Sequence, residues 1–408
     1  MLDKFKSLLE RLSKNSPFYQ EKFAQCGVDI DKVRTMEDIK HLPFTTKEEL
    51  RDAYPLGLQA VSDEDVVRIH SSSGTTGKPV IIPYTAKDVD MWAEMMCRCM
   101  RTAGITKKDR VQITPGYGLW TAGIGFQAGV ERLGAMAVPM GPGNTEKQLQ
   151  MMMDLKSTVL IGTSSYGLVI AEEVSKRGLR DKIHLRKGIF GSERWGEKMR
   201  RRIELELGIE TYDIYGLTEI YGPGIAIDCH FHEGMHYWDD HLYFEIIDPD
   251  TGEVLPEGEF GELVITTLTK EGAPLLRYRT RDLTRLIPGR CSCGSPHKRL
   301  DRIIGRTDDM VKVKGVNIYP GQIDGLLRSI DGVSSEYQVL ISHVDGKDVM
   351  TLRIEMDGQR HRSSVERMVA DHFKKHIGLS VNVEAVRLGA LPRSEKKTKR
   401  IFDYRDVS

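Results

Sequence analysis

Hydrophobic and polar positions follow two different periods along the first half of the chain. In residues 88–102 apolar side chains recur at helical spacing, which predicts an amphipathic helix. The short apolar segments 159–161 and 188–190 are separated by helical stretches. Because short strands that alternate with helices are typical of layered α/β proteins, this half is expected to form an α/β body.

The pattern changes to β-rich between residues 237 and 286. Runs such as YFEIID, GELVITTL and LTRLI are broken by the turn sequences DPDTG and PEGEFG. Short runs of this kind predict an antiparallel sheet or a distorted barrel.

After Ile304 the order of predicted elements is strand, turn, helix, strand, strand, helix and strand, and residues 361–378 form the clearest helix. We therefore predict an α/β fold class with three parts. The large N-terminal domain, with α/β sheets and a β-rich subdomain, spans 1–304, a polar junction spans 305–309, and a small, mobile α+β C-terminal domain spans 310–408.

Length and composition are those of a folded globular protein and give no sign of a nucleic-acid or membrane partner. The 408 residues exceed the size at which one core usually stops growing, 40% are hydrophobic, and 59 basic residues balance 59 acidic ones. The N-terminal segment mixes charges with leucines, unlike a secretory signal, and no apolar run is as long as a membrane span. We expect a cytoplasmic protein.

A glycine-rich segment, SSSGTTGKP at positions 71–79, lies between two predicted strands. Its glycines can present backbone N–H groups to an anion, and its hydroxyls and lysine add donors and charge. It differs from the GxxxxGK[ST] loop, because two residues separate its glycines and Pro79 replaces the magnesium-binding hydroxyl. The alternative is a surface turn. The expected phosphate-binding residues are Ser72, Ser73, Gly74, Thr75, Thr76, Gly77 and Lys78.

This segment resembles the signature loop of the adenylate-forming superfamily of acyl-CoA synthetases, adenylation domains and luciferase. Further segments resemble family motifs in the right order: YGLTE at 215–219, YRTRD at 278–282, GRTDD at 305–309 and SEKKTKR at 394–400. The segments LPFTTKEELRDAYP, GPGNTEKQ and RTDDMVKVKGVNIYP resemble its phenylacetate-CoA ligase branch.

The resemblance implies an ATP-dependent ligase that joins an acid, first as an acyl-adenylate, to coenzyme A. An anionic carboxylate must approach an anionic phosphate, so positive charge is needed at the reacting phosphorus. By the family match, Glu219 binds magnesium, Thr218 lies near the α-phosphate and Lys397 bridges carboxylate and phosphate, with Lys399 as the alternative. Without the resemblance, Glu219 reads as a solvated turn residue and SEKKTKR as a solvated tail.

The resemblance also implies the residues that bind ATP or AMP. Tyr215 is expected to stack on adenine, Asp282 to bind the ribose hydroxyls, and Arg306 to contact ribose or phosphate. The segment Gly191, Ser192 and Glu193 is expected to border adenine, although Ser192 and the following Arg194 depart from the branch pattern. Asp213 and Gly216 are assigned to the same site. Asp308 is the expected hinge, or else an ordinary linker residue.

Three cysteines and a histidine form a candidate zinc site. Cys291 and Cys293 are a tight pair, and Cys229 shortly precedes His236. A Cys₃His set suits a closed, structural zinc site, and it resembles a site in some members of the branch. His230, His232 and His297 compete for the fourth position, and three unligated buried thiols are the alternative. Cys97 and Cys99 are expected in the core.

The acid-binding slot is expected after Gly116, where small and apolar side chains can enclose an aromatic ring. The candidates are Tyr117, Trp120, Ala122, Gly123, Ile124, Tyr166 and Ile214. Trp120 and Ala122 stand where the branch usually has Phe and Gly, which leaves phenylacetate, its hydroxylated forms, indole-acetate and benzoate-like acids open. Trp120 could equally be a core residue.

Two other functions stay open at this point. One is an adenylyltransferase of the same branch, like those that adenylylate a deazaflavin cofactor, which transfers AMP without using CoA. The other is a non-catalytic nucleotide-binding regulator, against which Lys397, Glu219 and Asp282 argue together. The resemblance is compatible with a homodimer.

Overall fold

A computed structural model of the chain describes residues 1–72, 78–314, 316–344, 347–356, 360–393 and 399–405. The predicted loop residues Ser73–Gly77 and the predicted catalytic Lys397 lie outside these described residues. Within the described ranges, no helix is both long enough and apolar enough to cross a membrane.

The largest element of the fold is a mixed sheet of nine strands in the order β13-β14-β9-β8-β7-β6-β5-β3-β4. Strands β4, β3, β5, β6 and β7 run parallel, and the remaining neighbours pair antiparallel. The strands are β3 (Arg110–Ile113), β4 (Met136–Pro139), β5 (Val159–Thr163), β6 (Lys187–Gly191), β7 (Glu210–Leu217), β8 (Gly222–Asp228), β9 (Met235–Tyr237), β13 (Leu286–Ile287) and β14 (Arg299–Leu300).

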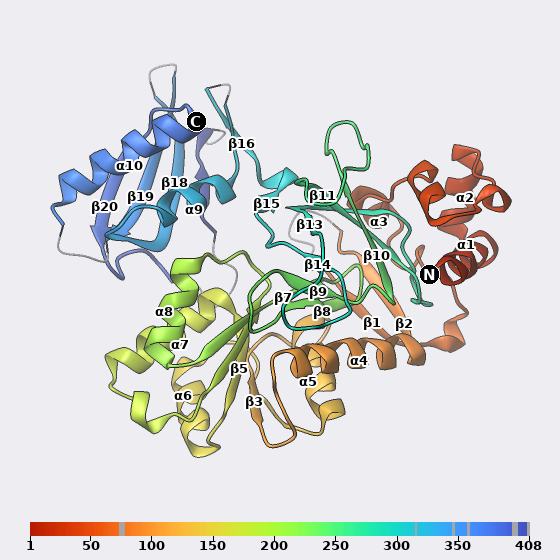
Figure 1. Cartoon of the computed structure of the whole chain (residues 1–408), viewed down its shortest axis with the longest axis horizontal. Helices are drawn as coiled ribbons and strands as arrows, with labels where there is room; N and C mark the ends of the chain where they lie inside the picture. The colour runs from red at the N-terminus through yellow and green to blue at the C-terminus, as the bar shows by residue number, and fades with distance from the viewer. Residues whose placement is uncertain (73–77, 315, 345–346, 357–359, 394–398, 406–408) are drawn as a thin grey trace.

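Helix α4 precedes the first parallel strand, four further helices connect the parallel strands, and together they cover the sheet (Figure 1). They are α4 (Ala86–Thr102), α5 (Thr121–Leu133), α6 (Thr145–Asp154), α7 (Ser164–Lys176) and α8 (Glu197–Leu207). The helix predicted over 88–102 is confirmed as α4, which begins after a capping box between Thr85 and Asp88. Glycine in α5 allows close packing, since a Cβ at Gly125 would lie 2.3 Å from the ring of Trp92.

The predicted β-rich part is an open antiparallel sheet in the order β10-β11-β12-β15, and not a barrel. Its strands are β10 (Leu242–Ile247), β11 (Gly261–Thr267), β12 (Tyr278–Thr284) and β15 (Gly305–Arg306). The strands predicted on both sides of the glycine-rich segment are confirmed as the hairpin β1 (Val66–Ser71) and β2 (Ile81–Thr85).

The N-terminal segment packs beside the β-rich sheet, at the right of Figure 1. It contains α1 (Leu2–Asn15), α2 (Pro17–Cys26) and α3 (Lys47–Asp52). Short 3₁₀ turns lie at η1 (Ile30–Lys32), η2 (Met36–His41), η3 (Asp63–Asp65), η4 (Arg180–Lys182) and η5 (Thr307–Asp309).

The C-terminal part forms a separate lobe, at the upper left of Figure 1, with its own core of residues such as Ile323, Leu352 and Phe373. Its sheet has the order β20-β19-β18-β21. The elements are β16 (Val311–Val313), β17 (Val316–Ile318), α9 (Pro320–Arg328), β18 (Val333–Val344), β19 (Lys347–Met356), α10 (Arg362–Ile377), β20 (Asn382–Arg387) and β21 (Ile401–Asp403).

The α/β fold class with a large N-terminal part and a smaller C-terminal part is confirmed. The C-terminal elements depart from the predicted order in two places: the single strand predicted before the first helix is the antiparallel pair β16 and β17, and the sequence pattern did not indicate the last strand, β21. This strand is three residues long and follows a charged run, so its apolar pattern is too short to recognise.

Candidate active site

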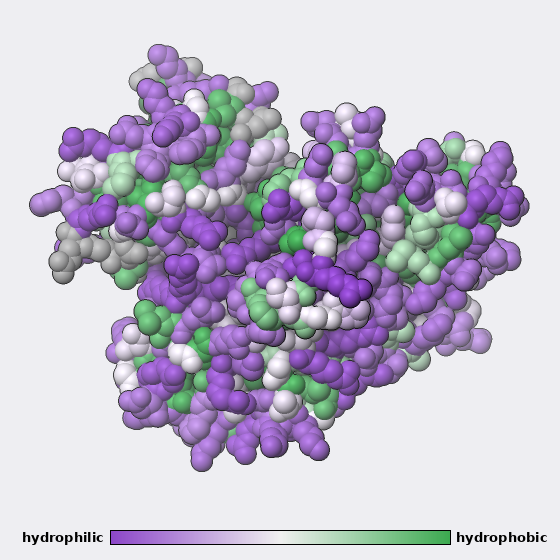
Figure 2. All heavy atoms as spheres, in the orientation of Figure 1, coloured by the Kyte–Doolittle hydropathy of each residue, from purple (hydrophilic) through white to green (hydrophobic). Residues whose placement is uncertain are grey.

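A cleft of about 1240 Å³ lies between the large sheet, the β-rich sheet and the C-terminal lobe. Figure 2 shows the surface hollowed between the C-terminal lobe and the sheet below it, along a mostly hydrophilic seam. The cleft is lined by the residues that follow β6, by the carboxyl end of β7, by alternate residues of β12, by most of residues 302–311, and by parts of α8, α9, β18 and β21. Its position is at the carboxyl ends of parallel strands, where ligands usually bind in open α/β sheets.

Most of the predicted nucleotide-binding residues are brought together at this cleft, although they come from distant segments. Those that line it are Ser72, Ser192, Glu193, Asp213, Tyr215, Gly216, Thr218, Glu219, Asp282, Arg306 and Asp308. Two predicted residues that the structure describes, Lys78 and Gly191, are not part of the lining. The Lys78 Nζ lies 5.7 Å from the centre of the Tyr54 ring, and Gly191 packs closely against Ile214.

A buried carboxylate, Asp282, is the centre of a hydrogen-bonded group in the cleft. Tyr215 donates its hydroxyl hydrogen to Asp282 Oδ2 at 2.5 Å, and Arg306 Nη1 donates to Oδ1 at 2.8 Å. Strands β12 and β15 place Asp282 directly opposite Arg306. Burial raises the pKa of Asp282, while the charge of Arg306 opposes that rise. Arg306 also pairs with Asp308 at 2.8 Å, so the predicted hinge residue is tied to this group.

The predicted magnesium ligand, Glu219, is buried at the cleft with an incompletely paired carboxylate. Its Oε1 has no hydrogen-bond partner among the described residues, and the Nζ of Lys47 lies 3.2 Å away. Sequence reasoning missed Lys47 as a site residue. The signal was present in the capping box of Thr46 and Glu49, which starts helix α3 and sets Lys47 at its first position.

A second missed lysine, Lys270, supports the backbone beside Glu219. Its buried Nζ donates to the carbonyl oxygens of Glu219, at 3.4 Å, and of Ile220. The rings of Tyr84 and Tyr221 lie 4.6 and 4.9 Å from it. Burial lowers the pKa of Lys270 to about 7. The sequence gives no signal for this role, because a lysine in a β-rich segment is normally exposed.

At the cleft, Asp213 lies near a second carboxylate. Its backbone N–H donates to Asp228 Oδ1 at 2.8 Å, and Arg200 pairs with Asp228 Oδ2 at 2.9 Å. Burial, reinforced by the charge of Asp228, raises the pKa of Asp213 to about 6. The arrangement leaves Asp228 paired and Asp213 facing the cleft.

The two ends of the glycine-rich segment are held together at the cleft. The Ser72 backbone N–H donates to the Val80 carbonyl at 3.0 Å, and the Val80 N–H donates to Ser72 Oγ at 2.9 Å. Ser71 and Ser72 both line the cleft. The segment therefore begins at the cleft, and its two ends are joined there by hydrogen bonds between Ser72 and Val80.

The predicted acid-binding slot is only partly assembled at the cleft. Trp120, Ala122 and Ile214 line it, and Trp120 is 45% exposed, so it is not a core residue. Tyr117, Gly123 and Ile124 are not part of the lining, and a Cβ at Gly123 would lie 2.7 Å from the ring of Tyr117.

Tyr166, also predicted for the slot, belongs to a separate core below α7. Its hydroxyl lies 3.3 Å from the Gly143 carbonyl oxygen and 3.2 Å from Thr145 Oγ1. The sequence could not separate the two positions, since an aromatic residue near a helix start fits either a core or a pocket.

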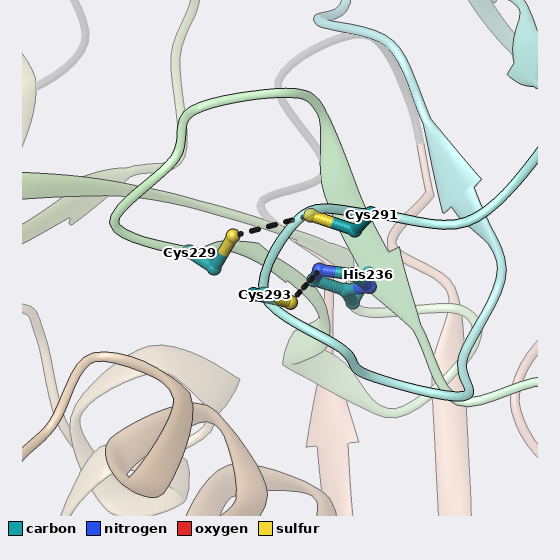
Figure 3. Close-up of side chains that lie close together, drawn as sticks. All are labelled: Cys229, His236, Cys291 and Cys293. Carbon is teal, nitrogen blue, oxygen red and sulfur yellow. Dashed lines mark hydrogen bonds between the residues drawn. The ribbon is translucent and has the colours of Figure 1, made fainter.

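The candidate zinc residues converge from the β8–β9 connection, from β9 and from the turn before β14 (Figure 3). The sulfurs of Cys229 and Cys291 lie 3.7 Å apart, and Cys293 Sγ lies 3.3 Å from His236 Nε2. The four ligand atoms all lie within 4.8 Å of one another. His236 Nδ1 lies 3.2 Å from the His297 carbonyl oxygen, which fixes the ring with Nε2 toward the sulfurs.

The competing histidines face other partners. His232 Nδ1 contacts Asp228 at 2.8 Å, His297 Nδ1 contacts Asp239 at 2.7 Å, and His230 packs against Phe231. Cys97 and Cys99 are buried in α4, so their prediction as core residues is confirmed.

From the C-terminal lobe, Lys399 and Arg400 line the cleft. The Nζ of Lys399 lies 5.2 Å from the Phe402 ring centre, and Arg400 pairs with Glu336 at 3.3 Å. Arg194, whose role the sequence left open, pairs with Asp324 of α9 and donates to the Ile304 carbonyl at 3.1 Å. It therefore links the large sheet to the C-terminal lobe.

Comparison with known proteins agrees with this architecture. The family model described as AMP-binding enzyme matches residues 13–269, and the one described as AMP-binding enzyme C-terminal domain matches 315–405. The phenylacetate-coenzyme A ligase of Pseudomonas putida is 43% identical over 100% of this chain and 94% of its own length. That of Escherichia coli (strain K12) is 42% identical over 99% and 94%. The chain therefore belongs to the AMP-binding enzyme family and, within it, to the phenylacetate-coenzyme A ligase family.

Solved structures of 2-hydroxyisobutyryl-CoA ligase match in more than one state. The postadenylation state in complex with 2-HIB-AMP gives a TM-score of 0.90 at 27% identity, covering 100% of this chain and 89% of that chain. The thioesterification state, with 2-HIB-AMP and CoA, gives 0.73 at 27% identity with the same coverage.

Proposed function

We propose that this chain is an ATP-dependent, AMP-forming ligase that joins an aromatic carboxylic acid, phenylacetate first among them, to coenzyme A. In this reaction the acid attacks the α-phosphate of ATP to give an acyl-adenylate and pyrophosphate. The thiol of CoA then displaces AMP to give the thioester. The observation that carries the proposal is the cleft in which YGLTE, Asp282 and Arg306 meet, in a chain whose full-length relatives are phenylacetate-coenzyme A ligases.

Asp282, Tyr215 and Arg306 are the proposed nucleotide-binding core. The Asp282 oxygens each accept one protein hydrogen bond, so each keeps a second lone pair for a ribose hydroxyl. The phenol ring of Tyr215 lines the cleft and is held through its hydroxyl, which leaves the ring face for adenine. Asp213 faces the same side as an acceptor for the adenine amino group.

Glu219 is the proposed magnesium ligand. Glu219 Oε1 is buried at the cleft and, among the described residues, faces only the ammonium group of Lys47 at 3.2 Å, and carboxylate is the hard ligand that Mg²⁺ prefers. When bound, the ion would neutralise phosphate charge during adenylation. Lys270 holds the Glu219 backbone in place, and Lys47 compensates the carboxylate charge.

The acid is proposed to bind against Trp120, Ala122 and Ile214, whose apolar surface suits an aromatic ring. Lys397 is the proposed lysine for the adenylation step, and the neighbouring Lys399 already lines the cleft. Rotation of the C-terminal domain, residues 310–408, about Asp308 would switch the site from adenylation to thioester formation. The N-terminal domain, residues 1–304, would stay fixed. The proposal includes a cytoplasmic location and a homodimer.

The Cys₃His cluster is proposed to hold a structural zinc ion. With Zn–S bonds of about 2.3 Å and Zn–N bonds of about 2.0 Å, a tetrahedral site requires S···S and S···N separations of about 3.8 and 3.5 Å. The separations of 3.7 Å between Cys229 and Cys291 and 3.3 Å between Cys293 and His236 agree with that geometry. The ion would join the β8–β9 connection to the turn before β14.

Zinc content tests this site directly. Purified protein is expected to hold one zinc ion per chain, and Cys293→Ser is expected to lose it with a lower melting temperature, because a structural zinc contributes folding free energy. Cys26→Ser, at an exposed cysteine, is the control. Full stability after complete removal of the metal by a chelator would contradict a structural role.

The decisive test of the function is a panel of aromatic and aliphatic acids assayed for pyrophosphate exchange and for CoA thioester. Phenylacetate should support both reactions, and Lys397→Ala should lose exchange while it stays folded. Exchange without thioester would indicate an adenylyltransferase. Binding of ATP without either product would indicate a regulator, and products from aliphatic acids alone would remove the aromatic-acid assignment.

A further inference from the structure

One arginine of the C-terminal lobe contacts carboxylates of both parts of the molecule. Arg393 Nη1 and Nη2 each donate to Glu355 at 2.9 Å. Its Nη2 and Nε also donate to Glu172, at 2.9 and 3.2 Å. Glu355 lies on β19 of the C-terminal lobe, whereas Glu172 lies on α7 beside the large sheet. The guanidinium group thus bridges the two parts.

The contact with Glu355 is internal to the C-terminal lobe. The Glu355 side chain is fully buried and also accepts a hydrogen bond from the Leu391 backbone N–H at 2.8 Å. A buried carboxylate needs a paired cation, and the planar guanidinium supplies two donors in a fixed orientation. Arg393 and Glu355 therefore move as one unit, so of these two ion pairs of Arg393 it is the one with Glu172 that has to break when the lobe moves.

The contact with Glu172 joins the C-terminal lobe to a fixed point on the large part. Arg393 immediately precedes residues 394–398, which include Lys397. Glu172 is itself held by Arg202 of α8 at 2.8 Å, so the anchor on the large part is fixed by a second ion pair. Lys198 makes another contact between the parts, to the Ile330 carbonyl at 2.6 Å, but far from this segment in the sequence.

The arrangement of the two parts is closer to the postadenylation structures of 2-hydroxyisobutyryl-CoA ligase than to its thioesterification structure. We infer that Glu172 and Arg393 are positioning residues for the adenylation half-reaction: their ion pair holds the C-terminal lobe against α7 in the adenylation arrangement, and it opens before thioester formation. This inference rests on the proposed function and on Lys397 as its lysine.

The test separates the two half-reactions in the full chain. Adenylation is measured as phenylacetate-dependent exchange of pyrophosphate into ATP, and thioester formation is measured from synthetic phenylacetyl-AMP and CoA. Glu172→Gln keeps the shape but removes the charge, and it should lower the kcat of exchange by about tenfold or more, as expected for a charged hydrogen bond. Thioester formation from phenylacetyl-AMP should stay within about twofold of wild type. Glu172→Asp should recover part of the exchange rate.

The control is Glu173→Gln at the neighbouring position. Glu173 pairs with Lys176 and Arg177 on the same helix and makes no ion pair with the C-terminal lobe within the described residues. It should leave both half-reactions unchanged. Equal losses in both half-reactions of the Glu172→Gln variant, or an unchanged exchange rate, would overturn the inference.

Small-angle X-ray scattering without substrate separates this inference from the proposed function. If the wild type activates no acid, the proposed function fails, and scattering still tests the ion pair. Glu172→Gln should then shift the profile toward a more open particle while Glu173→Gln matches wild type. Identical scattering profiles for the wild type and both variants would show that the Glu172–Arg393 ion pair does not hold the two parts together, and would overturn the inference.

Discussion

Replacement of Asp213 by asparagine should stabilise the protein, and the gain should depend on pH. Asp213 faces the cleft beside Asp228, whose charge is already matched by Arg200. Burial and this second carboxylate raise the pKa of Asp213 from 3.8 to about 6. A raised carboxyl pKa means that the folded state prefers the protonated form, so the ionised side chain opposes folding at neutral pH.

The size of the effect follows from the shift in pKa. The difference between 3.8 and about 6 corresponds to about 3 kcal/mol at pH 8, where the group is ionised in both states. At pH 5 the folded carboxyl is mostly protonated, and about half of the cost remains. Water in the cleft screens the charge, so we expect Asp213→Asn to add between about 1 and 3 kcal/mol at pH 8.

Urea unfolding of wild type and Asp213→Asn at pH 8 and pH 5, followed by tryptophan fluorescence, measures this gain. The variant should unfold at higher urea at pH 8, and the difference should shrink at pH 5. Asp331→Asn, at a side chain that is 92% exposed, controls for the loss of one negative charge. A variant less stable than wild type at pH 8, or an equal gain at both pH values, would refute the reasoning.

Two further substitutions test the packing that positions the site. Arg277→Met should destabilise the chain by about 3–5 kcal/mol in urea unfolding, because it leaves the carboxylate of Glu245, 2% exposed, buried without its partner. The double variant that also carries Glu245→Met should recover most of the lost stability. Gly216→Ala should abolish adenylate formation and lower the melting temperature, since its Cβ would lie 2.0 Å from the Gly222 carbonyl oxygen. The control is Gly325→Ala, whose Cβ would have no atom within 4 Å of the kind that would clash, so it should leave stability unchanged or raise it.

Regular elements were predictable wherever local periodicity determined them. The amphipathic pattern in α4 and α10 and the apolar runs in β5 and β6 are local signals that tertiary packing did not override. The meeting of Asp282 with Tyr215 in one cleft is different. Spacing alone contains no information on that contact, and only the resemblance to a family with an established order of motifs indicated it.

Residues whose role depends on burial could not be found from the sequence. Lys270 is surrounded by two tyrosine rings and bonded to two carbonyls because β2, the turn between β7 and β8, and the β11–β12 connection meet at that point. Arg393 and Arg194 stand in charged segments that are normally solvated, yet the C-terminal lobe lies against α7 and the large sheet there. The charge pattern is the same for an exposed arginine and for one between two lobes.

The fourth member of the cysteine cluster shows why spacing alone could not select among the histidines. His236 lies on β9, where its partner in β14 is Arg299, so the sheet register carries the ring to the turn that holds Cys291 and Cys293. His232 is nearer to Cys229 in sequence, but it adopts a left-handed backbone conformation and turns toward Asp228. Strand pairing therefore decides the ligand set, because β9 and β14 are far apart in the chain and adjacent in the sheet.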